Sequence, residues 1–270
     1  MSQRVTPGRR WLFPDGHTVI LAERGGALAP LPLDAPGVID EDAEVAMAPG
    51  VRAAVVDSVP DGPGDVTVVE RRTALGLLDH DLFHEMHRAF HLARWHRRTR
   101  FCGTCGNPTR FADGEMAKVC AACGATDYPR ISPATIMAVV RDGALLMAHN
   151  RHRSDSMCSV LAGFVEPGES LEQCVAREVY EETRVVVRSV RYFASQPWAF
   201  PDSLMVGFTA EWASGEIHPD PDEIDHAGWY RADALPATIP PGVSISRRLI
   251  EWFVAEYGST EDLRRVMERP

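Results

Sequence analysis

Three glutamates, Glu178, Glu181 and Glu182, lie within the stretch REVYEETRV at residues 177–185. In an α-helix these positions share one face, where the three carboxylates would repel one another. Projected at about 100° per residue, Glu178 and Glu182 fall within about 20° of Leu171. Glu181 falls about 80° from the same residue. We therefore expect the glutamates to continue the apolar stripe that the first half of the helix buries.

Carboxylates buried in this number need positive charge beside them, because an unpaired buried carboxylate costs several kcal/mol. Arg177 can pair with one of the three and with Glu169 upstream. The hard oxygen ligands that remain suit Mg²⁺ or Mn²⁺, which bind a few carboxylates together with substrate phosphates. The alternative is a helix end that protrudes from the core and solvates its charges.

The helix that would position these glutamates has a clear start. A Pro-Gly turn in VEPGES precedes Ser170, and Gln173 three residues later completes a capping box. The apolar stripe of the helix consists of Leu171, Cys174, Val175 and Val179.

A second candidate metal site consists of cysteines. The pairs Cys102-Gly-Thr-Cys105 and Cys120-Ala-Ala-Cys123 are separated by 14 residues. Two such pairs supply four thiolates for one tetrahedral zinc, and because all four positions are cysteine the zinc would be structural. Disulfides or a redox motif are the alternatives, disfavoured in a cytoplasmic chain and by the repetition of the motif. Two further cysteines, Cys158 and Cys174, are expected to pack as small hydrophobes.

Composition limits the function classes. The 270 residues are 45% hydrophobic and 24% charged, as in ordinary globular proteins, with room for two domains. A formal net charge of −10 argues against a general nucleic-acid binder and suits a protein that collects divalent cations. No apolar run reaches the length of a membrane span, and no signal segment is evident at the N-terminus. We expect a cytoplasmic protein.

One local exception to the acidic composition is HRAFHLARWHRRTRF, residues 87–101, which is strongly basic. It is either the solvated face of a helix or a patch that contacts phosphates.

The remaining elements follow from periodicity and turn residues. Residues 17–23, 52–59 and 65–72 are typical of short strands, and residues 73–98 of a helix with Leu82, Met86, Ala89, Phe90 and Ala93 at helical spacing. Asp142-Gly143 joins two apolar runs into a hairpin over residues 134–150. Strands are expected at 184–195 and 203–212, and a final helix begins near Ser246.

Residues 163–185, GFVEPGESLEQCVAREVYEETRV, resemble the Nudix box, G-x5-E-x7-R-E-U-x-E-E-x-G-U, in which U is aliphatic. One position departs, since Arg184 stands where the family has glycine. Residues 195–203, SQPWAFPDS, resemble the SQPWPFPxS signature of the NADH pyrophosphatase branch, with Ala199 in place of a proline. That branch also has a four-cysteine zinc ribbon before its Nudix domain, so the resemblance covers the chain from about residue 101 to its end.

The resemblance implies an α+β fold, with a Nudix α/β/α sandwich around a mixed sheet. A four-cysteine zinc ribbon and a small β-rich N-terminal domain precede the sandwich. The implied boundaries are residues 1–98 for the N-terminal domain with its closing helix, 99–130 for the ribbon and 131–270 for the Nudix domain. A homodimer is implied on the same basis.

The resemblance also implies roles for particular residues. Mg²⁺ or Mn²⁺, one to three ions per site, would be held by the backbone oxygen of Ala162 and by Glu178, Glu181, Glu182 and the more distant Glu223. Glu182 or Glu181 would act as the base on the attacking water, without a preference between them. The implied catalytic set is Glu169, Arg177, Glu178, Glu181 and Glu182.

The substrate would be contacted by a second set of residues. Phe164 would stack on a base, and Tyr128 would reach the substrate from the partner subunit. The full implied set is Glu115, Tyr128, Phe164, Gln196, Pro197, Trp198, Ala199, Phe200, Pro201, Asp202, Ser203 and Ser246. Core packing is the alternative for Trp198 and Phe200. The prolines on both sides favour a rigid loop over a central strand.

These implications give a Mg²⁺- or Mn²⁺-dependent pyrophosphatase that cleaves NADH to NMNH and AMP, acts on NAD⁺, and removes NAD caps from RNA. One alternative is a Nudix hydrolase of ADP-ribose or dinucleoside polyphosphates. Another is a zinc-ribbon protein that binds RNA or proteins and carries an inactive Nudix domain.

Overall fold

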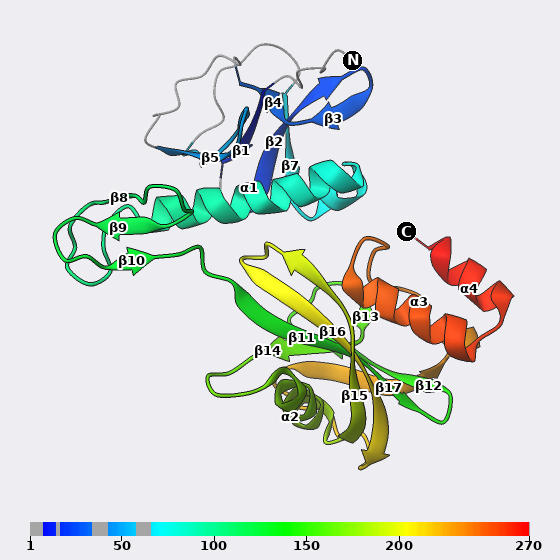
Figure 1. The fold of residues 1–270 in the computed structure, drawn as a ribbon. Helices are drawn as coiled ribbons and strands as arrows, with labels where there is room; N and C mark the ends of the chain where they lie inside the picture. Colours follow the sequence, from blue (N-terminus) through cyan, green and yellow to red (C-terminus); the bar gives the residue numbers. More distant parts are fainter. Residues whose placement is uncertain (1–7, 15–16, 34–42, 58–65, 270) are drawn as a thin grey trace, which may run out of the picture. The chain divides into compact units, whose positions relative to one another are not determined.

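The computed structural model of the chain describes residues 8–14, 17–33, 43–57 and 66–269 (Figure 1). The chain divides into two compact units. The first consists of residues 1–131 together with 199–202, and the second of residues 132–198 together with 203–270. Within the described ranges, no helix is both long enough and apolar enough to cross a membrane.

The first unit is built on a sheet with the strand order β3-β2-β1-β6-β5, in which β4 pairs with β1 and β7 with β2. Its strands are β1 (Arg9–Phe13), β2 (Thr18–Arg24), β3 (Ala27–Ala29), β4 (Leu31–Pro32), β5 (Glu44–Ala48), β6 (Val51–Val55) and β7 (Val66–Glu70). The three strands predicted here correspond to β2, β6 and β7. Predicted strand residues 58, 59 and 65 lie outside the described ranges.

Helix α1 (His80–Arg98) packs against β1, β5 and β6 of this sheet (Figure 1). It begins later than predicted because the Asp79 side chain accepts the backbone N–H of Leu82 at 2.9 Å and caps the helix. The preceding segment, Thr73–Gly76, forms a 3₁₀ turn (η2). Of the predicted helical positions, those buried are Met86, Ala89, Phe90 and Ala93.

The zinc-ribbon segment forms a small sheet with the order β10-β9-β8. Its strands are β8 (Thr109–Phe111), β9 (Lys118–Cys120) and β10 (Thr126–Asp127). Each cysteine pair closes a tight turn, since the backbone N–H groups of Gly106 and Gly124 donate to the carbonyls of Cys102 and Cys120, both at 2.9 Å. Both glycines have positive φ, 74° and 76°, which glycine adopts without strain.

The second unit contains a mixed sheet in the order β13-β12-β11-β16-β15, in which β14 pairs with β11 and β17 with β12. Its strands are β11 (Ser132–Arg141), β12 (Ala144–Asn150), β13 (Cys158–Ser159), β14 (Leu161–Phe164), β15 (Val186–Trp198), β16 (Ser203–Ser214) and β17 (Ile224–Arg231). β11 and β16 run parallel, whereas the other neighbours in the sheet are antiparallel.

Helices cover both faces of this sheet (Figure 1). Alternate residues of β11 point to opposite sides, so Ile136 and Ala138 join the core under α3 (Ile245–Tyr257) while Met137 and Val139 join the core under α2 (Leu171–Thr183). The α/β/α sandwich is therefore confirmed. Two short helical elements were not predicted, the 3₁₀ turn η3 (Ala232–Ala234) and helix α4 (Thr260–Met267).

The predicted hairpin is confirmed, and it connects β11 to β12. Asp142 and Gly143 have φ values of 49° and 74°, as a two-residue hairpin turn with two positive φ angles requires.

Helix α2 begins at the residue that its sequence indicates. Ser170 and Gln173 form both hydrogen bonds of the capping box. Arg184 ends the helix in the left-handed conformation, with φ 63° and ψ 10°, and its N–H donates to the Tyr180 carbonyl at 2.8 Å. The arginine therefore keeps the backbone conformation that glycine would adopt more easily, at a cost of about 1 kcal/mol.

Replacing Arg184 by glycine should stabilise the protein by about 1 kcal/mol, because glycine adopts positive φ without the Cβ clash. Denaturant unfolding of wild type and Arg184→Gly would measure this difference. Arg184→Ala is the matched control, since it also removes the contact of the guanidinium with the Tyr180 ring at 5.4 Å but keeps the Cβ. Equal stabilisation by both variants would show that the side chain, rather than the backbone, sets the effect.

Candidate active site

The Arg177 side chain is the centre of the acidic cluster in the second unit. Its Nε and Nη2 donate to the two carboxylate oxygens of Glu169 at 2.8 and 2.9 Å. Its Nη1 donates to Glu178 at 2.8 Å and to Glu181 at 2.9 Å. Nη2 also donates to the carbonyl of Phe164 at 2.9 Å. One guanidinium thereby connects the loop before α2 to two glutamates on the helix.

This pairing fixes the charge of Glu169. Hydrogen bonds from Arg177 hold the pKa of the Glu169 carboxyl at about 2, although burial acts in the opposite direction, and the backbone N–H of Glu166 donates to it as well. The same hydrogen bonds raise the pKa of Arg177. Glu169 therefore stays ionised near neutral pH. Both of its carboxylate oxygens accept hydrogen bonds from Arg177, so they are not free to bind a metal.

Glu178 lies against the backbone of β14. A Cβ added at Gly163 would fall within 1.8 to 2.1 Å of the Glu178 carboxylate, so only glycine leaves room for this side chain. Burial raises the pKa of Glu178, while Arg177 partly opposes that shift. The Glu178 carboxylate thus lies beside the strand residue that follows Ala162, the predicted backbone ligand.

Glu182 is the most buried carboxylate of the cluster, with 7% of its surface exposed. Burial raises its pKa to about 8, and the negative charges of Glu178, Glu223 and Asp220 add to the effect. No hydrogen bond or ion pair reaches its carboxylate within the described part of the chain. A buried acid surrounded by other acids is a donor set that fits a divalent cation.

The projection placed all three glutamates on the buried side, and for Glu181 this is wrong. Its side chain is 54% exposed and reaches Arg177 across one helical turn. At about 80° from the centre of the stripe, the helix surface has already left the core. Glu223 is also exposed, in the turn that precedes β17. Its charge acts on Glu178 and Glu182, so these three residues are neighbours as the resemblance implied.

Among the described residues, the four cysteines are the side chains whose ligand atoms lie close enough together to bind one metal ion. Their sulfur atoms all lie within 4.8 Å of one another, whereas the glutamates form no such set. The physical reason is that Arg177 holds Glu178 and Glu181 while Glu182 faces other carboxylates.

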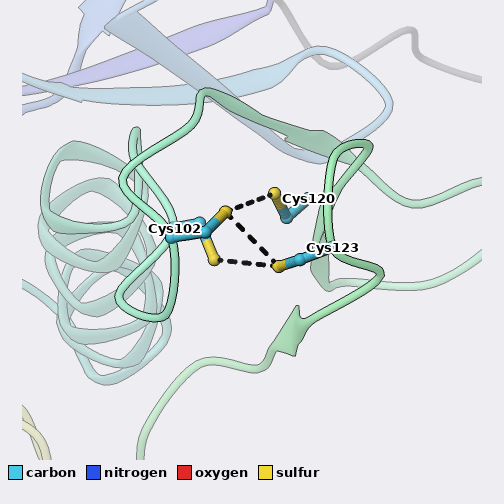
Figure 2. A group of neighbouring side chains, drawn as sticks. Cys102, Cys120 and Cys123 are labelled. Carbon is cyan, nitrogen blue, oxygen red and sulfur yellow. Dashed lines mark hydrogen bonds between the residues drawn. The ribbon is translucent and has the colours of Figure 1, made fainter.

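The four cysteines match the geometry of a zinc site (Figure 2). The Sγ atoms of Cys105 lie 3.4 Å from Cys123 and 3.5 Å from Cys120, and Cys102 lies 3.6 Å from Cys123. Tetrahedral zinc with Zn–S bonds of about 2.3 Å separates its sulfurs by about 3.8 Å. A disulfide would need about 2.05 Å, so these cysteines form no disulfides with one another.

The electrostatics of this cluster also favour a cation. The Asn107 side chain and backbone lower the pKa of Cys105 to about 6. The backbone N–H of Ala125 lowers the pKa of Cys123, yet its cysteine neighbours outweigh this and raise it to about 12. Thiolate formation at one position thus opposes it at the next, and a bound zinc removes that conflict.

The segment SQPWAFPDS is divided between the two units. Gln196, Pro197 and Trp198 end β15 and pair with β16, so the interpretation as a loop is wrong for them. Because β15 is an edge strand, Pro197 needs no partner for its missing N–H. Residues 199–202 form the loop and belong to the first unit, whereas Ser203 begins β16.

The loop of residues 199–202 is held by side chains from the first unit. Arg71 donates to the Ala199 carbonyl at 2.7 Å, and the Ala199 N–H donates to His87 Nδ1 at 3.3 Å. The Asp202 carboxylate lies 3.6 Å from Arg94. Sequence reasoning missed these residues. Arg94 belongs to the basic run at residues 87–101, which the sequence marks as a possible phosphate-contacting patch. Nothing in the sequence marks Arg71, because a single arginine after a strand is common.

Two predicted substrate residues have structural partners in the second unit. The Gln196 amide donates to the Val243 carbonyl at 2.8 Å and accepts from the Ile245 N–H at 2.7 Å. It thereby positions the start of α3. Ser246 contacts the Ser159 hydroxyl at 2.7 Å. Both side chains are buried. This favours a structural role, holding the elements around the site in place, over direct contact with a substrate.

Three other predicted contacts are exposed. Tyr128 donates to Glu115 at 3.3 Å in the first unit, a contact that the sequence did not predict. Phe164, in the second unit, is 55% exposed at the end of β14. An exposed phenylalanine beside Arg177 suits stacking on a planar ligand.

Two family descriptions match the chain. The NUDIX domain matches residues 131–253, and the NADH pyrophosphatase zinc ribbon domain matches residues 97–128. These two segments contain the acidic cluster and the four cysteines, respectively.

Curated relatives agree with this. The chain is 49% identical over 178 residues to a protein named NAD-capped RNA hydrolase NudC from Stutzerimonas stutzeri (strain A1501). The matched residues make up 66% of this chain and 64% of that protein. A protein of the same name from Citrobacter koseri is 46% identical over 213 residues, 76% of this chain and 82% of that protein. Another, from Pectobacterium carotovorum subsp. carotovorum, is 51% identical over 178 residues, 65% and 68% of the two chains. The resemblance to the NADH pyrophosphatase branch is thereby confirmed.

Each chain should bind about one zinc ion, and Cys120→Ser should lose it, because three thiolates with an open position hold zinc far more weakly than four. Elemental analysis of purified protein would measure the zinc, and hydrogen exchange over residues 101–128 would report whether the ribbon loses its protection. Cys158→Ser is the matched control, since Cys158 is buried outside the cluster. Full zinc occupancy in Cys120→Ser would contradict the assignment.

The metal-free protein should lose stability as the pH rises from about 4.5 towards 8. Over that range Glu182 keeps its proton in the folded state, with a pKa of about 8, but has lost it in the unfolded chain, with a pKa near 4.5. Glu182→Gln should flatten this dependence and exceed wild type at pH 8 by a few kcal/mol. Denaturant unfolding with a chelator present measures it. Glu172→Gln, exposed on the first turn of α2, should keep the wild-type slope. An unchanged slope in Glu182→Gln would argue against a buried, protonated Glu182.

Proposed function

We propose that the chain hydrolyses the diphosphate of NADH, of NAD⁺ and of the NAD cap of RNA. The premise is that the chain belongs to the Nudix hydrolases that carry the NADH pyrophosphatase zinc ribbon. The observation that carries this proposal is the buried, acid-surrounded Glu182 beside Glu178 and Glu223. In its ionised form such a cluster is unfavourable unless cations enter it, and the bound cations can then hold an anionic substrate.

The residues available to hold Mg²⁺ or Mn²⁺ are Glu178, Glu182, Glu223 and the backbone oxygen of Ala162, with Glu181 at the edge. When bound, a divalent ion neutralises charge on the diphosphate and lowers the pKa of an attacking water. Arg177 holds Glu178 and Glu181 in place, and so orients the face on which the diphosphate would lie.

The base that takes the proton of the water is Glu182 or Glu181. Glu182 is poised by its raised pKa, whereas Glu181 is exposed and can move toward a bound substrate once a phosphate competes for Arg177.

Aromatic side chains would select the two bases of the dinucleotide. The exposed Phe164 ring suits stacking, and Trp198 and Phe200 belong to the segment that the family uses for its substrate. Tyr128 and Glu115, which contact each other, would act across a homodimer.

We also propose that the protein is cytoplasmic and that its domains are residues 1–98, 99–130 and 131–270.

Product analysis tests the activity. Incubated with Mg²⁺, the protein should convert NADH into NMNH and AMP, and NAD-capped RNA into 5′-phosphorylated RNA and NMN. Parallel reactions with NAD⁺ and ADP-ribose would rank the substrates. Cleavage of ADP-ribose alone would support a Nudix hydrolase of another substrate class.

Glu182→Gln should reduce kcat for NADH by about a hundredfold or more, because it removes a charged metal ligand while keeping the side-chain volume. Glu172→Gln changes the same charge on the same helix and should keep wild-type kcat. Wild-type turnover by Glu182→Gln at saturating Mg²⁺ would remove Glu182 from the metal site.

A further inference from the structure

Two adjoining hollows in the first unit are lined by an excess of positive charge. Their volumes are about 510 and 220 Å³, and they share Arg94 and Pro201. Three carboxylates also line them. The five arginines that line the hollows are Arg71, Arg72, Arg94, Arg98 and Arg130. Because the whole chain has a net charge of −10, this excess is a local reversal of sign.

The hollows explain the basic run in the sequence. His91, Arg94 and Arg98 follow one another at i, i+3 and i+7 of α1 and therefore share one face of the helix. That face lines the smaller hollow, with Arg98 exposed. Of the two interpretations of residues 87–101, the structure favours the phosphate-contacting patch.

Part of this lining is rigid. The Arg71 guanidinium lies 3.4 Å from the centre of the Phe90 ring and 4.6 Å from that of Phe200, and it donates to the Ala199 carbonyl. It is therefore a fixed cationic wall of the larger hollow. Two of the three carboxylates have partners of their own, since Asp127 accepts from Trp95 at 2.6 Å and Asp202 lies 3.6 Å from Arg94.

Other donors in the hollows remain available. Arg98 and Arg130 are exposed, and in the described ranges their guanidinium groups form no hydrogen bond or ion pair. Burial lowers the pKa of Arg94, and the charge of Arg98 adds to this, so an incoming anion would relieve repulsion between the two. The rise from Arg94 to Arg98 along the helix is about 6 Å, enough to spread the donors over more than one phosphate.

We infer that the two hollows bind successive phosphates of a single RNA strand, as the phosphodiester-binding site of the enzyme. This rests on the proposed function, because the strand would be the body of an NAD-capped RNA. A groove of arginines distributed along its length suits a polyanion better than one mononucleotide. The wall formed by residues 199–202 follows Trp198 directly in the chain, so the segment expected to contact the cap also lines this site.

The double variant Arg98→Gln with Arg130→Gln tests the inference. Its affinity for a single-stranded RNA oligonucleotide without a cap should fall roughly tenfold. The slope of log affinity against log salt should become shallower by about 1.4, as expected for two lost phosphate contacts at about 0.7 each. The kcat/KM for NADH should stay at the wild-type value, which also shows that the variant folds. The kcat/KM for NAD-capped RNA should fall through KM.

The matched control is Arg191→Gln with Arg231→Gln, which removes the same charge from exposed positions of the second unit. It should keep the RNA affinity of wild type. An equal loss in control and test variants would reduce the effect to net charge and overturn the inference. Wild-type affinity and salt slope in the test variant would overturn it as well.

Two further probes separate other anions from RNA. If AMP or inorganic phosphate binds wild type and is lost in the test variant while RNA affinity is unchanged, the hollows hold a free phosphate and the inference fails. Binding to vesicles of anionic phospholipid in place of RNA would also overturn it. The RNA-binding measurement needs no turnover. An inactive wild type whose RNA binding still depends on Arg98 and Arg130 would remove the proposed function but leave this site.

Discussion

The Arg177 guanidinium holds together the parts of the acidic cluster. It bonds to Glu169 before the helix, to Glu178 and Glu181 on the helix, and to the Phe164 carbonyl at the end of β14. Without this cation the Glu169 carboxylate in the loop would face the helix glutamates unpaired, and its pKa would no longer be held at about 2. The arrangement leaves Glu182 without a cationic partner, so its carboxyl keeps a proton that a divalent ion can replace.

The chain separates its charges by unit. The second unit gathers carboxylates that suit divalent cations, while the first unit gathers arginines along α1 and after β7. A doubly anionic diphosphate needs cations to enter an acidic site, whereas a phosphodiester strand can be met by arginines directly. The net charge of −10 sums over both units and therefore does not show this division.

The zinc-ribbon segment has too small an apolar core to be stable by packing alone. Its three short strands bury few apolar side chains, and two of its most buried residues are themselves cysteines, Cys102 and Cys120. A segment of this size lacks a sufficient core, so a metal that binds four thiolates supplies the missing stabilisation. The two glycine turns bring the cysteines close enough without strain.

The sequence by itself determined the features that depend on local spacing. These are the cysteine pairs, the capping box at Ser170 and the hairpin at Asp142-Gly143, each determined by residues close together in the chain. Only the tertiary structure decided the rest, because it depends on what packs against a residue from elsewhere. Periodicity placed Glu181 on the buried side, but the neighbouring elements leave it exposed. Arg71 acquires its role only when β7, α1 and residues 199–202 meet around it.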